Sequence, residues 1–579
     1  MIPENIIIMG YNVQGYNETI NKGYKLRKDL DYIQFIFPID YRYYYNNFDR
    51  NFIWSLQCWY HLLPYIYNFE KTKDIDCMKL IINEIHNWYK YILNLSDKET
   101  LKHLVWDDMA TGIRGQILAY LNQYENNNIN NLISTHISFL INENNWRLHN
   151  HCFFMCFGLI MLSEKHFKFA YNKLNELINY QFIEGIHCEN SPEYHIKVYE
   201  LLNKFYKQNS LILDKSLKSD LNIIYYNIFW LLRGDNKITP IGDSETVIYN
   251  NNFKLELYKQ SNITVPHKCI GLSYKNFIYK IFKKTGYISI KNFENNFSFL
   301  MIANSICKNH KHADNLTFEI YYKQPILINP GKYAYTTDNK RQYVLSTRSH
   351  NCVQIEEHNY QIGNPQLVDY KPYTTLKNVD QNEGLTINLS YINEFKKKHT
   401  RVIDIINEKK YIISDTIEHF INFTQHFHLG QFFTNYIKVN DYMYIFLDDK
   451  LNRLQIKSNE IISVFKSLIQ NNVYETGWYS PNYNTFNENF GIIIKSTSSK
   501  LITEFDYEEN ESSIEENESS IEENNLVKKC DDYEELSNDH ILNLCENYNE
   551  TIDDNESIMR ENDLVEKYDD YEELSNIIF

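Results

Sequence analysis

No stretch of this chain has the roughly 18 consecutive apolar residues that a membrane-spanning helix needs, so we expect no membrane span. The N-terminus, Met1 to Met9, also lacks the basic start and the small-residue cleavage site of a standard signal peptide. Together these two absences predict a cytoplasmic protein.

Several motifs of catalysis and metal binding are missing as well. The 10 cysteines are scattered without CxxC or zinc-finger spacing, which indicates buried thiols rather than a zinc finger or a redox pair. Cys152 and Cys156, for example, lie four residues apart in an apolar helical run. The chain has no P-loop, no dinucleotide-binding fingerprint and no serine or cysteine nucleophile motif.

The chain is long, rich in aromatic residues and uneven in charge. Its 579 residues exceed what one hydrophobic core organises and predict about two to four domains. Among 48 Tyr and 33 Phe, no single exposed Tyr marks a binding site, because Tyr also serves at half-buried positions. Residues 503–579 hold 27 Asp and Glu against 4 Lys and Arg, which leaves the preceding part mildly basic. A basic body suits an anionic substrate, and we expect no nucleic-acid partner.

The spacing of apolar residues divides the chain into regions. After an N-terminal extension at 1–47, residues 48–250 show apolar positions every three or four residues, with short polar links, which predicts helical hairpins in series. Residues 251–502 alternate and are rich in β-branched residues, and Val402–Asp415 is typical of a β-hairpin. The predicted fold class is multidomain α+β, a helical domain followed by an antiparallel, sandwich-like β domain.

The C-terminal region 503–579 is acidic and repetitive. Asn510–Glu516 recurs at once as Asn517–Glu523, and Asn517–Asn538 recurs with changes as Asn555–Asn576. Such sequence buries too little apolar surface to offset chain entropy, so we predict disorder. A solubilising tail is our first interpretation, and binding of an unknown protein partner is the alternative.

The densest group of chemically active side chains is His310, His312 and Asp314, which directly precede the strand-like segment Leu316–Tyr322. If the run is extended, its two-residue period places the three side chains on one face. Imidazole exchanges protons near neutral pH and is a common metal ligand. Alone, the run is compatible with a proton-transfer site, a metal site or a hydrogen-bonded strand end.

Two further polar groups stand at predicted helix starts. Asn150 and His151 precede an apolar helix, where unpaired N–H groups favour a bound anion, and a plain cap with a surface histidine is the alternative. Ser191-Pro192 predicts a helix start that holds Tyr194 and His195 in the first turn.

Six motifs occur in the order seen in the heparinase II/III and alginate lyase superfamily, which the chain resembles from about Asp49 to Lys495. They are Asn150-His151, Glu189–His195, Pro240–Asp243, His310–Asp314, Asn329–Tyr335 and Arg348–Asn351. The resemblance implies an incomplete (α/α) toroid, then a layered antiparallel β domain, with the active site between them. It also implies an anionic polysaccharide or oligosaccharide as partner, and leaves a periplasmic or extracellular location open.

The reaction implied by the resemblance is β-elimination of a uronate-containing polysaccharide. The C5 proton leaves only if the neighbouring carboxylate is neutralised, while a base takes the proton and an acid protonates the leaving oxygen. By this resemblance Asn150 and His151 neutralise the carboxylate, Tyr194 is the acid/base, and His310 is the second proton-transfer residue. Tyr194 needs cationic or hydrogen-bonding neighbours to act as a base near neutrality, because the pKa of free tyrosine is about 10.

Three further residues are candidates for substrate binding. Arg114 lies in a segment that resembles a family segment lining the toroid, and an ion pair with Asp107 or Asp108 is the alternative. Arg348 and His195 are the other two candidates.

In relatives that hold a metal, the positions matching His312, Asn329 and His350 form a structural zinc site. Asn329 stands where an Asp is expected, and a neutral amide is a much poorer zinc ligand than a carboxylate. The alternative is a hydrogen-bonded support for His310. The chemistry itself requires no cofactor.

Two other functions remain open from the sequence. A lyase-like protein that binds or helps to assemble a surface or capsular polysaccharide, without cleaving it, is favoured by the missing export signal and by Asn329. A zinc hydrolase built on His310, His312 and Asp314 is the weaker alternative. Neither the glycan nor endo or exo action is predicted.

Overall fold

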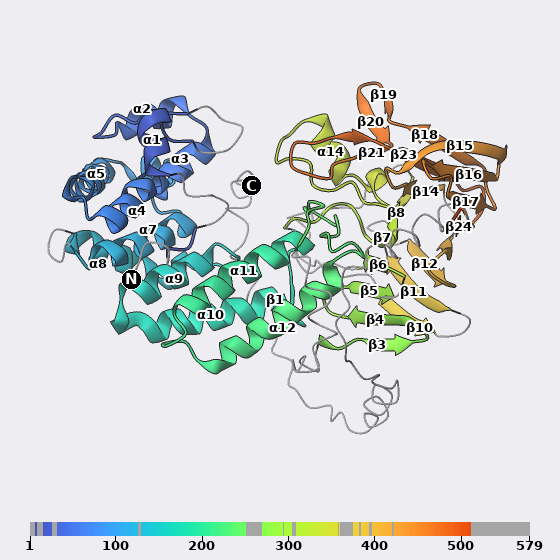
Figure 1. Cartoon of the computed structure of the whole chain (residues 1–579), viewed down its shortest axis with the longest axis horizontal. Coiled ribbons are helices and arrows are strands. Elements are labelled where there is room, and N and C mark those ends of the chain that lie inside the picture. Colours follow the sequence, from blue (N-terminus) through green and yellow to red (C-terminus); the bar gives the residue numbers. More distant parts are fainter. Residues whose placement is uncertain are drawn as a thin grey trace, which may run out of the picture.

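The structure, a computed structural model, shows a helical domain followed by a β domain (Figure 1), as the sequence predicts. It describes residues 6–8, 15–25, 32–124, 129–249, 269–292, 295–303, 309–356, 358, 375–380, 384–392, 397–419 and 422–510.

The helical domain consists of amphipathic helices joined by short links. Each long helix buries an apolar stripe, as α5 does with Ile81, Ile85 and Trp88 at three- and four-residue spacing. The helices are α1 (Tyr16–Lys22), α2 (Tyr41–Asn47), α3 (Arg50–Gln57), η2 (Tyr60–Leu62), α4 (Leu63–Thr72), α5 (Ile75–Leu93), α6 (Asp97–Lys102), α7 (Asp108–Leu121), α8 (Asn130–Leu140), η3 (Glu143–Asn145), α9 (Cys152–Leu162), η4 (Glu164–His166), α10 (Phe167–Gln181), α11 (Pro192–Gln208) and α12 (Lys215–Leu231). A small hairpin of β1 (Phe182–Ile183) and β2 (Ile186–His187) precedes α11.

The N-terminal extension packs into this domain. Ile6, Ile7, Tyr41 and Tyr44 are buried in the same apolar core as the later helices. The predicted boundary at residue 47 is therefore not a boundary between cores.

Helices α7 and α9 approach each other unusually closely, because glycines stand at their contact. A Cβ on Gly112 would lie 2.2 Å from the backbone of Phe154, and one on Gly158 would lie 2.4 Å from the carbonyl oxygen of Gly112. The contact brings the starts of the two helices, Asp108 and His151, within reach of each other.

The β domain contains three larger antiparallel sheets. Their orders are β10-β11-β12-β13-β24-β17-β16-β15, β18-β23-β14-β9 and β3-β4-β5-β6-β7-β8. The strands are β3 (Leu272–Tyr274), β4 (Phe277–Phe282), β5 (Tyr287–Asn292), β6 (Phe297–Ile302), β7 (Thr317–Tyr322), β8 (Gln324–Leu327), β9 (Val353–Ile355), β10 (Thr375–Asp380), β11 (Leu385–Ile392), β12 (Lys398–Ile405), β13 (Lys410–Ile417), β14 (Phe423–His428), β15 (Phe433–Asn440), β16 (Met443–Asp448), β17 (Arg453–Ser458), β18 (Ile462–Lys466), β23 (Phe490–Lys495) and β24 (Lys500–Glu508). Two minor hairpins add β19 (Leu468–Gln470), β20 (Val473–Thr476), β21 (Trp478–Tyr479) and β22 (Asn487–Glu488). The short helices α14 (Asn339–Leu345) and η6 (Thr347–Ser349) lie between β8 and β9.

Alternating burial explains these strands. In β12 and β13 every second residue is buried and the others are partly exposed, and the two strands pair directly. The hairpin predicted from Val402–Asp415 is thus confirmed. Strand β24 continues to Glu508 between β13 and β17, so the β domain extends beyond residue 502. The predicted disorder of the remaining tail lies outside the described residues.

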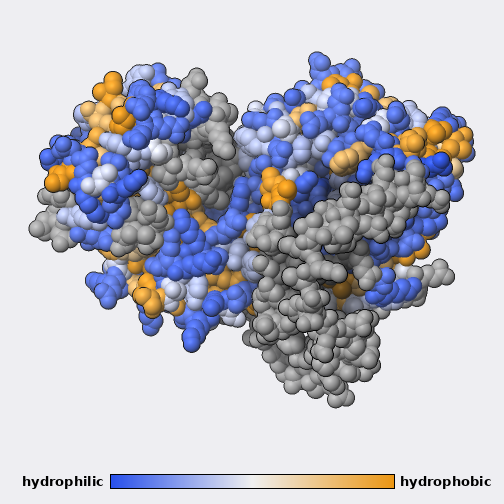
Figure 2. All heavy atoms as spheres, in the orientation of Figure 1, coloured by the Kyte–Doolittle hydropathy of each residue, from blue (hydrophilic) through white to orange (hydrophobic). Residues whose placement is uncertain are grey.

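Apolar side chains are exposed along one edge of the eight-stranded sheet. Phe432, Ile437 and Val439 are 45%, 53% and 47% exposed on or beside β15, the last strand of the eight-stranded sheet. Apolar side chains gather there at the right of Figure 2. Within the described part of the chain, no helix combines the length and apolar character needed to cross a membrane.

Candidate active site

The helical domain contributes the first turn of α11. The predicted start is confirmed: Pro192 is the first helical residue, and Ser191 Oγ accepts the N–H of Tyr194 at 3.2 Å. Ser191 Oγ also donates to the carbonyl of Asp243 at 3.0 Å. The start of α11 is therefore tied to the segment that leads into the β domain.

An ion-pair group joins the two domains beside this helix start. Lys332 Nζ of the β domain lies 3.1 Å from Glu193 Oε1 and 2.5 Å from Glu245 Oε1. Both Lys332 and Glu193 are buried. The pairs hold α11 against the loop after β8.

The β domain contributes His310 from the loop between β6 and β7. His310 has a φ of +56°, and β7 begins only at Thr317. Asp314 pairs with Lys311 rather than sharing a face with His310. The prediction of one extended face is therefore wrong, because the left-handed backbone breaks the two-residue alternation. The zinc-hydrolase alternative loses its geometric basis, because Asp314 pairs with Lys311 while His310 and His312 both contact Asp243.

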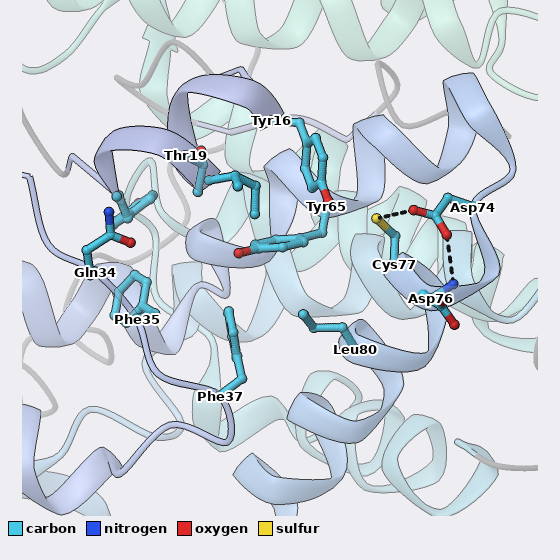
Figure 3. Close-up of a pocket in the computed structure, with 13 residues that line it drawn as sticks. Tyr16, Thr19, Gln34, Phe35, Phe37, Tyr65, Asp74, Asp76, Cys77 and Leu80 are labelled. Atoms are coloured by element: carbon cyan, nitrogen blue, oxygen red, sulfur yellow. Dashed lines mark hydrogen bonds between the residues drawn. The ribbon is translucent and has the colours of Figure 1, made fainter.

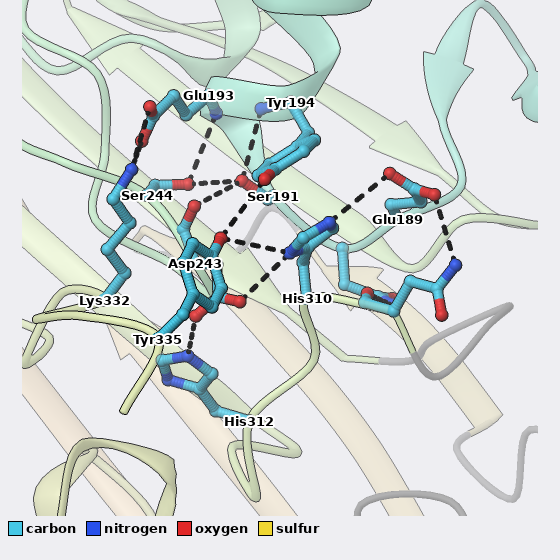
Figure 4. A network of polar contacts seen from close by, with 12 residues as sticks. Glu189, Ser191, Glu193, Tyr194, Asp243, Ser244, His310, His312, Lys332 and Tyr335 are labelled. Carbon is cyan, nitrogen blue, oxygen red and sulfur yellow. Dashed lines mark hydrogen bonds and ion pairs between the residues drawn. The ribbon is translucent and has the colours of Figure 1, made fainter. Parts of the chain in front are cut away.

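Tyr194, His310 and Tyr335 form a continuous polar contact (Figure 4). The ring of Tyr194 stacks on the imidazole of His310, with centroids 3.6 Å apart. The hydroxyl of Tyr335 lies 3.1 Å from that of Tyr194 and 3.4 Å from Nδ1 of His310. The three side chains come from both domains and create a path along which protons can move.

Asp243 contacts His310 and two further side chains, His312 and Arg341. Its carboxylate lies 3.0 Å from His310 Nδ1 and 2.9 Å from His312 Nε2, and it accepts two hydrogen bonds from Arg341 at 2.7 and 3.1 Å. Although burial opposes ionisation, the Arg341 guanidinium and the two imidazoles hold the pKa of Asp243 well below its usual range. An ionised carboxylate only accepts, so Nδ1 of His310 carries a ring hydrogen.

Tyr194 keeps its proton near neutral pH. Burial raises its pKa well above the ordinary value, and the carboxylates of Asp243, Glu189 and Glu193 act in the same direction. The hydrogen bond with Tyr335 opposes this shift only in part. Tyr194 therefore suits the acid rather than the base.

Asn150 and Glu189 connect the start of α9 to this group. Asn150 Nδ2 donates to Glu189 Oε2, and Asn309 Nδ2 donates to Glu189 Oε1, both at 3.2 Å. Glu189 Oε2 also lies 3.7 Å from His310 Nε2. His187, His310 and the Asn309 amide lower the pKa of Glu189 against its burial, so this buried carboxylate is ionised.

His151 meets Asp108 at the start of α7. His151 Nδ1 lies 3.3 Å from Asp108 Oδ1, and His149 Nε2 lies 3.1 Å from Asp108 Oδ2. Burial lowers the pKa of His151, but Asp108, and more remotely Asp107 and Glu189, raise it above the ordinary value. The pKa of Asp108 lies well below its usual range despite burial, because the two imidazoles stabilise its charge.

Comparison with known proteins identifies part of this chain. Residues 276–517 match the family described as heparinase II/III-like, C-terminal. The chain contains a heparinase II/III-like C-terminal domain. No curated protein matches the sequence.

Solved structures extend the likeness to most of the chain. Heparinase III is similar at 15% identity and a TM-score of 0.64, over 89% of this chain and 86% of that one. A heparinase III with methylated lysines is similar at 14% identity and a TM-score of 0.64, over 88% of this chain and 86% of that one. The heparan sulfate lyase HepC from Pedobacter heparinus is similar at 15% identity and a TM-score of 0.62, also over 88% of this chain and 86% of that one. The chain therefore has the fold of these lyases, with the helical domain in front of the heparinase-like domain.

Two of the predicted substrate-binding residues lie inside the helical domain. Arg114 is fully buried and donates to the carbonyls of Gln57 and Val105, each at 2.7 Å. His195 accepts the N–H of His187 through Nδ1, and its Nε2 lies 3.0 Å from the carbonyl of Ile224. Both side chains are buried and hydrogen-bonded within the helical core, so the structure offers a core role for each, and their contact with substrate stays a prediction.

Arg348, the third candidate, lies in η6 of the heparinase-like domain. Its guanidinium pairs with Glu475 of β20, and about a quarter of the side chain is exposed. No carboxylate of the Asp243 and Glu189 group contacts it among the described residues. A role of Arg348 in binding an anion remains a prediction.

The imidazole rings of His312 and His350 lie behind His310, where the resemblance implies zinc, with centroids 5.3 Å apart. His312 donates its Nε2–H to Asp243. The other ring nitrogen of His312, Nδ1, is buried and has no hydrogen-bond partner. His350 directs Nε2 to the carbonyl of Val344 at 3.0 Å, and its Nδ1 lies 3.1 Å from Asn329 Oδ1. Burial and nearby cationic groups hold the pKa of His350 well below its ordinary value, so no second proton bridges Nδ1 and that oxygen. The two imidazole lone pairs suit a cation, whereas the Asn329 amide is a weak ligand whose Oδ1 already accepts the Thr317 hydroxyl at 2.6 Å.

Another group of side chains has metal-compatible spacing. Ligand atoms of Asp108, His149 and Cys152 lie within 4.8 Å of one another, the one such His, Cys, Asp or Glu group among the described residues. However, His149 Nδ1 accepts the N–H of His151 at 3.3 Å, so Nε2 carries the ring hydrogen that Asp108 accepts. This protonation favours a hydrogen-bonded cluster over a metal site.

A separate cavity of about 360 Å³ opens in the helical domain (Figure 3). Tyr16, Phe35, Phe37 and Tyr65 line it, with Asp74 at one side. It shares no residue with the group around Tyr194.

The sequence assigned no role to Asp243, Glu189, Tyr335 or Arg341, and it offered Asp108 only as an ion-pair partner of Arg114. The first three lie inside the quoted motifs, so a charged or phenolic residue within a motif was the available signal. Nothing in the sequence pointed to Arg341, because its carboxylate partner lies 98 residues away.

Proposed function

We propose that this protein is a polysaccharide lyase that cleaves a uronate-containing anionic polysaccharide by β-elimination. The observation that carries the proposal is the stacked pair of Tyr194 and His310, from different domains, within a lyase fold. The Asp243 carboxylate gives His310 a defined ring hydrogen on Nδ1. A proton donor and a proton acceptor thus stand side by side.

The carboxylate of the uronate would bind at the start of α9. Asn150 supplies an amide N–H, and His151 supplies an imidazole whose pKa is raised by Asp108. Neutralising the carboxylate spreads the negative charge that develops when the C5 proton leaves. Glu189 already uses one N–H of Asn150, so substrate would bind beside Glu189 rather than replace it.

Proton transfer would be divided between His310 and Tyr194. The lone pair on His310 Nε2 takes the C5 proton, and the C–H electrons form the C4–C5 double bond. As the C4–O4 bond breaks, its electrons stay on O4, which receives the phenolic proton of Tyr194. The raised pKa of Tyr194 fits the acid, and Tyr335 offers a route for returning the proton from His310.

His312, Asn329 and His350 would hold a structural zinc ion behind the site. Bound there, zinc supplies positive charge and cross-links three loops without taking part in proton transfer. Because His312 and His310 share Asp243, a fixed His312 would also fix His310.

A second function, glycan binding without cleavage, is favoured by one observation. Glu189, an ionised carboxylate, lies beside the proposed carboxylate-binding residues and opposes a second negative charge. On this account the protein would bind or help to assemble a surface or capsular polysaccharide. The acidic tail would then bind an unknown protein partner. The predicted cytoplasmic location would fit a glycan that the cell makes internally.

Depolymerisation followed by mass spectrometry separates these functions. Uronate polysaccharides are incubated with the protein, sized by gel filtration, and the products weighed. We expect shorter products in which the new non-reducing end is one water lighter than a hydrolysis product, because elimination adds no water. Products with the full mass of hydrolysed fragments would indicate a hydrolase. Binding with unchanged polymer length, the same in wild type and Tyr194→Phe, would favour the non-catalytic function.

A further inference from the structure

Two histidines from one loop converge on a single carboxylate from another helix. His149 and His151 precede α9, and they contact different oxygens of Asp108, the first residue of α7. An acidic residue in a first helical turn is common, because it faces the partial positive charge of the helix end. That role does not require histidine partners on both oxygens.

We propose that Asp108 is a positioning residue that orients His151 and keeps it cationic for binding the substrate carboxylate. The inference rests on the proposed function, because it assigns His151 its charge in that reaction. Asp108 touches neither the substrate nor the reacting atoms in this scheme.

The hydrogen-bond pattern fixes the orientation of His151. The ionised Asp108 carboxylate only accepts, so the hydrogen on His151 Nδ1 points at Oδ1. The backbone N–H of His151 donates to Nδ1 of His149, whose Nε2 donates to Oδ2. This closed ring of contacts sets the direction of both imidazoles.

The close packing of α7 and α9 makes the contact rigid. Gly112 and Gly158 leave no room for a Cβ between the two helices, so their starts cannot drift apart without separating the helix backbones. Only 12% of the His151 side chain and 18% of Asp108 are exposed, which limits screening by solvent.

Charged groups from three segments act on His151. Asp108 makes the direct contact from α7, whereas Asp107 commits its carboxylate to Trp54 Nε1 and the N–H of Ala110, each at 3.0 Å. Glu189 acts from the segment before α11. The neighbouring His149 adds positive charge when protonated, and it shares Asp108. Asp108 is therefore the group whose removal isolates the effect.

The test combines Asp108→Asn with a direct titration of His151. Labelled histidine is followed by NMR across pH in the full chain, with His151→Gln used to assign the resonance. In wild type we expect a pKa above the free value of about 6.5, and in Asp108→Asn a pKa lower by about one unit or more. The control Asp76→Asn removes an exposed first-turn carboxylate of α5 and should leave the titration unchanged.

Activity supplies a second readout that a purely structural role would not produce. Near pH 8 we expect kcat/KM of Asp108→Asn to be about one tenth of the wild-type value. This difference should shrink as the pH falls, because acid protonates His151 in both proteins. Asp108→Glu should retain the wild-type profile.

Two results would overturn the inference: a wild-type His151 pKa at or below the free value, or an Asp108→Asn activity ratio that is constant across pH. The first needs no variant, so it decides even if Asp108→Asn does not fold. If wild type cleaves no glycan, the proposed function fails, and the titration still decides the role of Asp108.

Discussion

The aromatic ring of Tyr194 lies on the imidazole of His310, with centroids 3.6 Å apart and ring planes inclined by 19°. Tyr194 comes from a helix of the first domain and His310 from a loop of the second. The contact therefore exists only when the two domains are docked. It makes the proposed chemistry a property of the interface.

Replacing Tyr194 by Phe removes the proposed acid while keeping the stacked ring. We expect kcat to fall by about 100-fold or more, with glycan binding retained, because only the proton donor is lost. Steady-state kinetics and a binding isotherm measure the two effects. Tyr199→Phe makes the same change on the same helix and should keep near-normal kcat. Equal kcat for Tyr194→Phe and wild type would show that the Tyr194 hydroxyl is not the acid.

Asp243→Asn should lower the free energy of unfolding and make that free energy less dependent on pH in the acidic range. Removing the charge leaves the buried Arg341 unpaired, so the free energy of unfolding should drop by about 3 kcal/mol at neutral pH. Since the folded pKa of Asp243 is depressed, its stabilisation is present above the unfolded pKa of about 3.9 and is lost as pH falls through the folded value.

Thermal unfolding between neutral and acidic pH measures this effect. Wild type should lose more stability on acidification than Asp243→Asn does. The control Asp441→Asn changes an exposed carboxylate paired with Lys438 and should be nearly neutral. Parallel pH curves for wild type and Asp243→Asn would contradict the assignment.

Arg114→Lys separates a core role from substrate binding. Lysine cannot reproduce the two hydrogen bonds to the carbonyls of Gln57 and Val105, so urea unfolding should show a loss of about 3 kcal/mol. KM of the folded protein should stay unchanged. The exposed Arg453→Lys should alter stability by less than about 0.5 kcal/mol. A raised KM with unaltered stability in Arg114→Lys would indicate that Arg114 binds the substrate.

Asn329→Asp should strengthen zinc binding. A carboxylate at this position completes a set with His312 and His350, and we expect at least about tenfold tighter binding than in wild type. Calorimetry with zinc and elemental analysis of the purified protein measure it. His350→Ala should abolish binding in both backgrounds. Equal zinc affinity of wild type and Asn329→Asp would mean that residue 329 is not a ligand.

The sequence predicted the two domain types well, because apolar periodicity reports directly on helices and strands. The helix start at Ser191-Pro192 followed from local capping chemistry, and the β12–β13 hairpin followed from alternation. The prediction for the His310 run failed for a local reason: His310 adopts a positive φ, which is uncommon for any residue other than glycine and which the two-residue period does not reveal.

Contacts between distant residues were beyond the reach of pattern analysis. The sequence offered Arg114 as a substrate-binding residue or as one half of an ion pair, yet three Trp rings surround its guanidinium in the folded domain. The carboxylate of Asp243 gains its role only when the fold brings Arg341 from helix α14 and His310 from the loop between β6 and β7. Such convergence depends on the tertiary fold rather than on spacing.

The ultraviolet absorbance of the products tests the central claim most directly. β-Elimination leaves a C4–C5 double bond conjugated with the uronate carboxylate, so the absorbance of a uronate polysaccharide should rise with time in wild type. It should stay flat in Tyr194→Phe and in His310→Ala. Depolymerisation without any rise in absorbance, or an equal rise in all three proteins, would contradict the account.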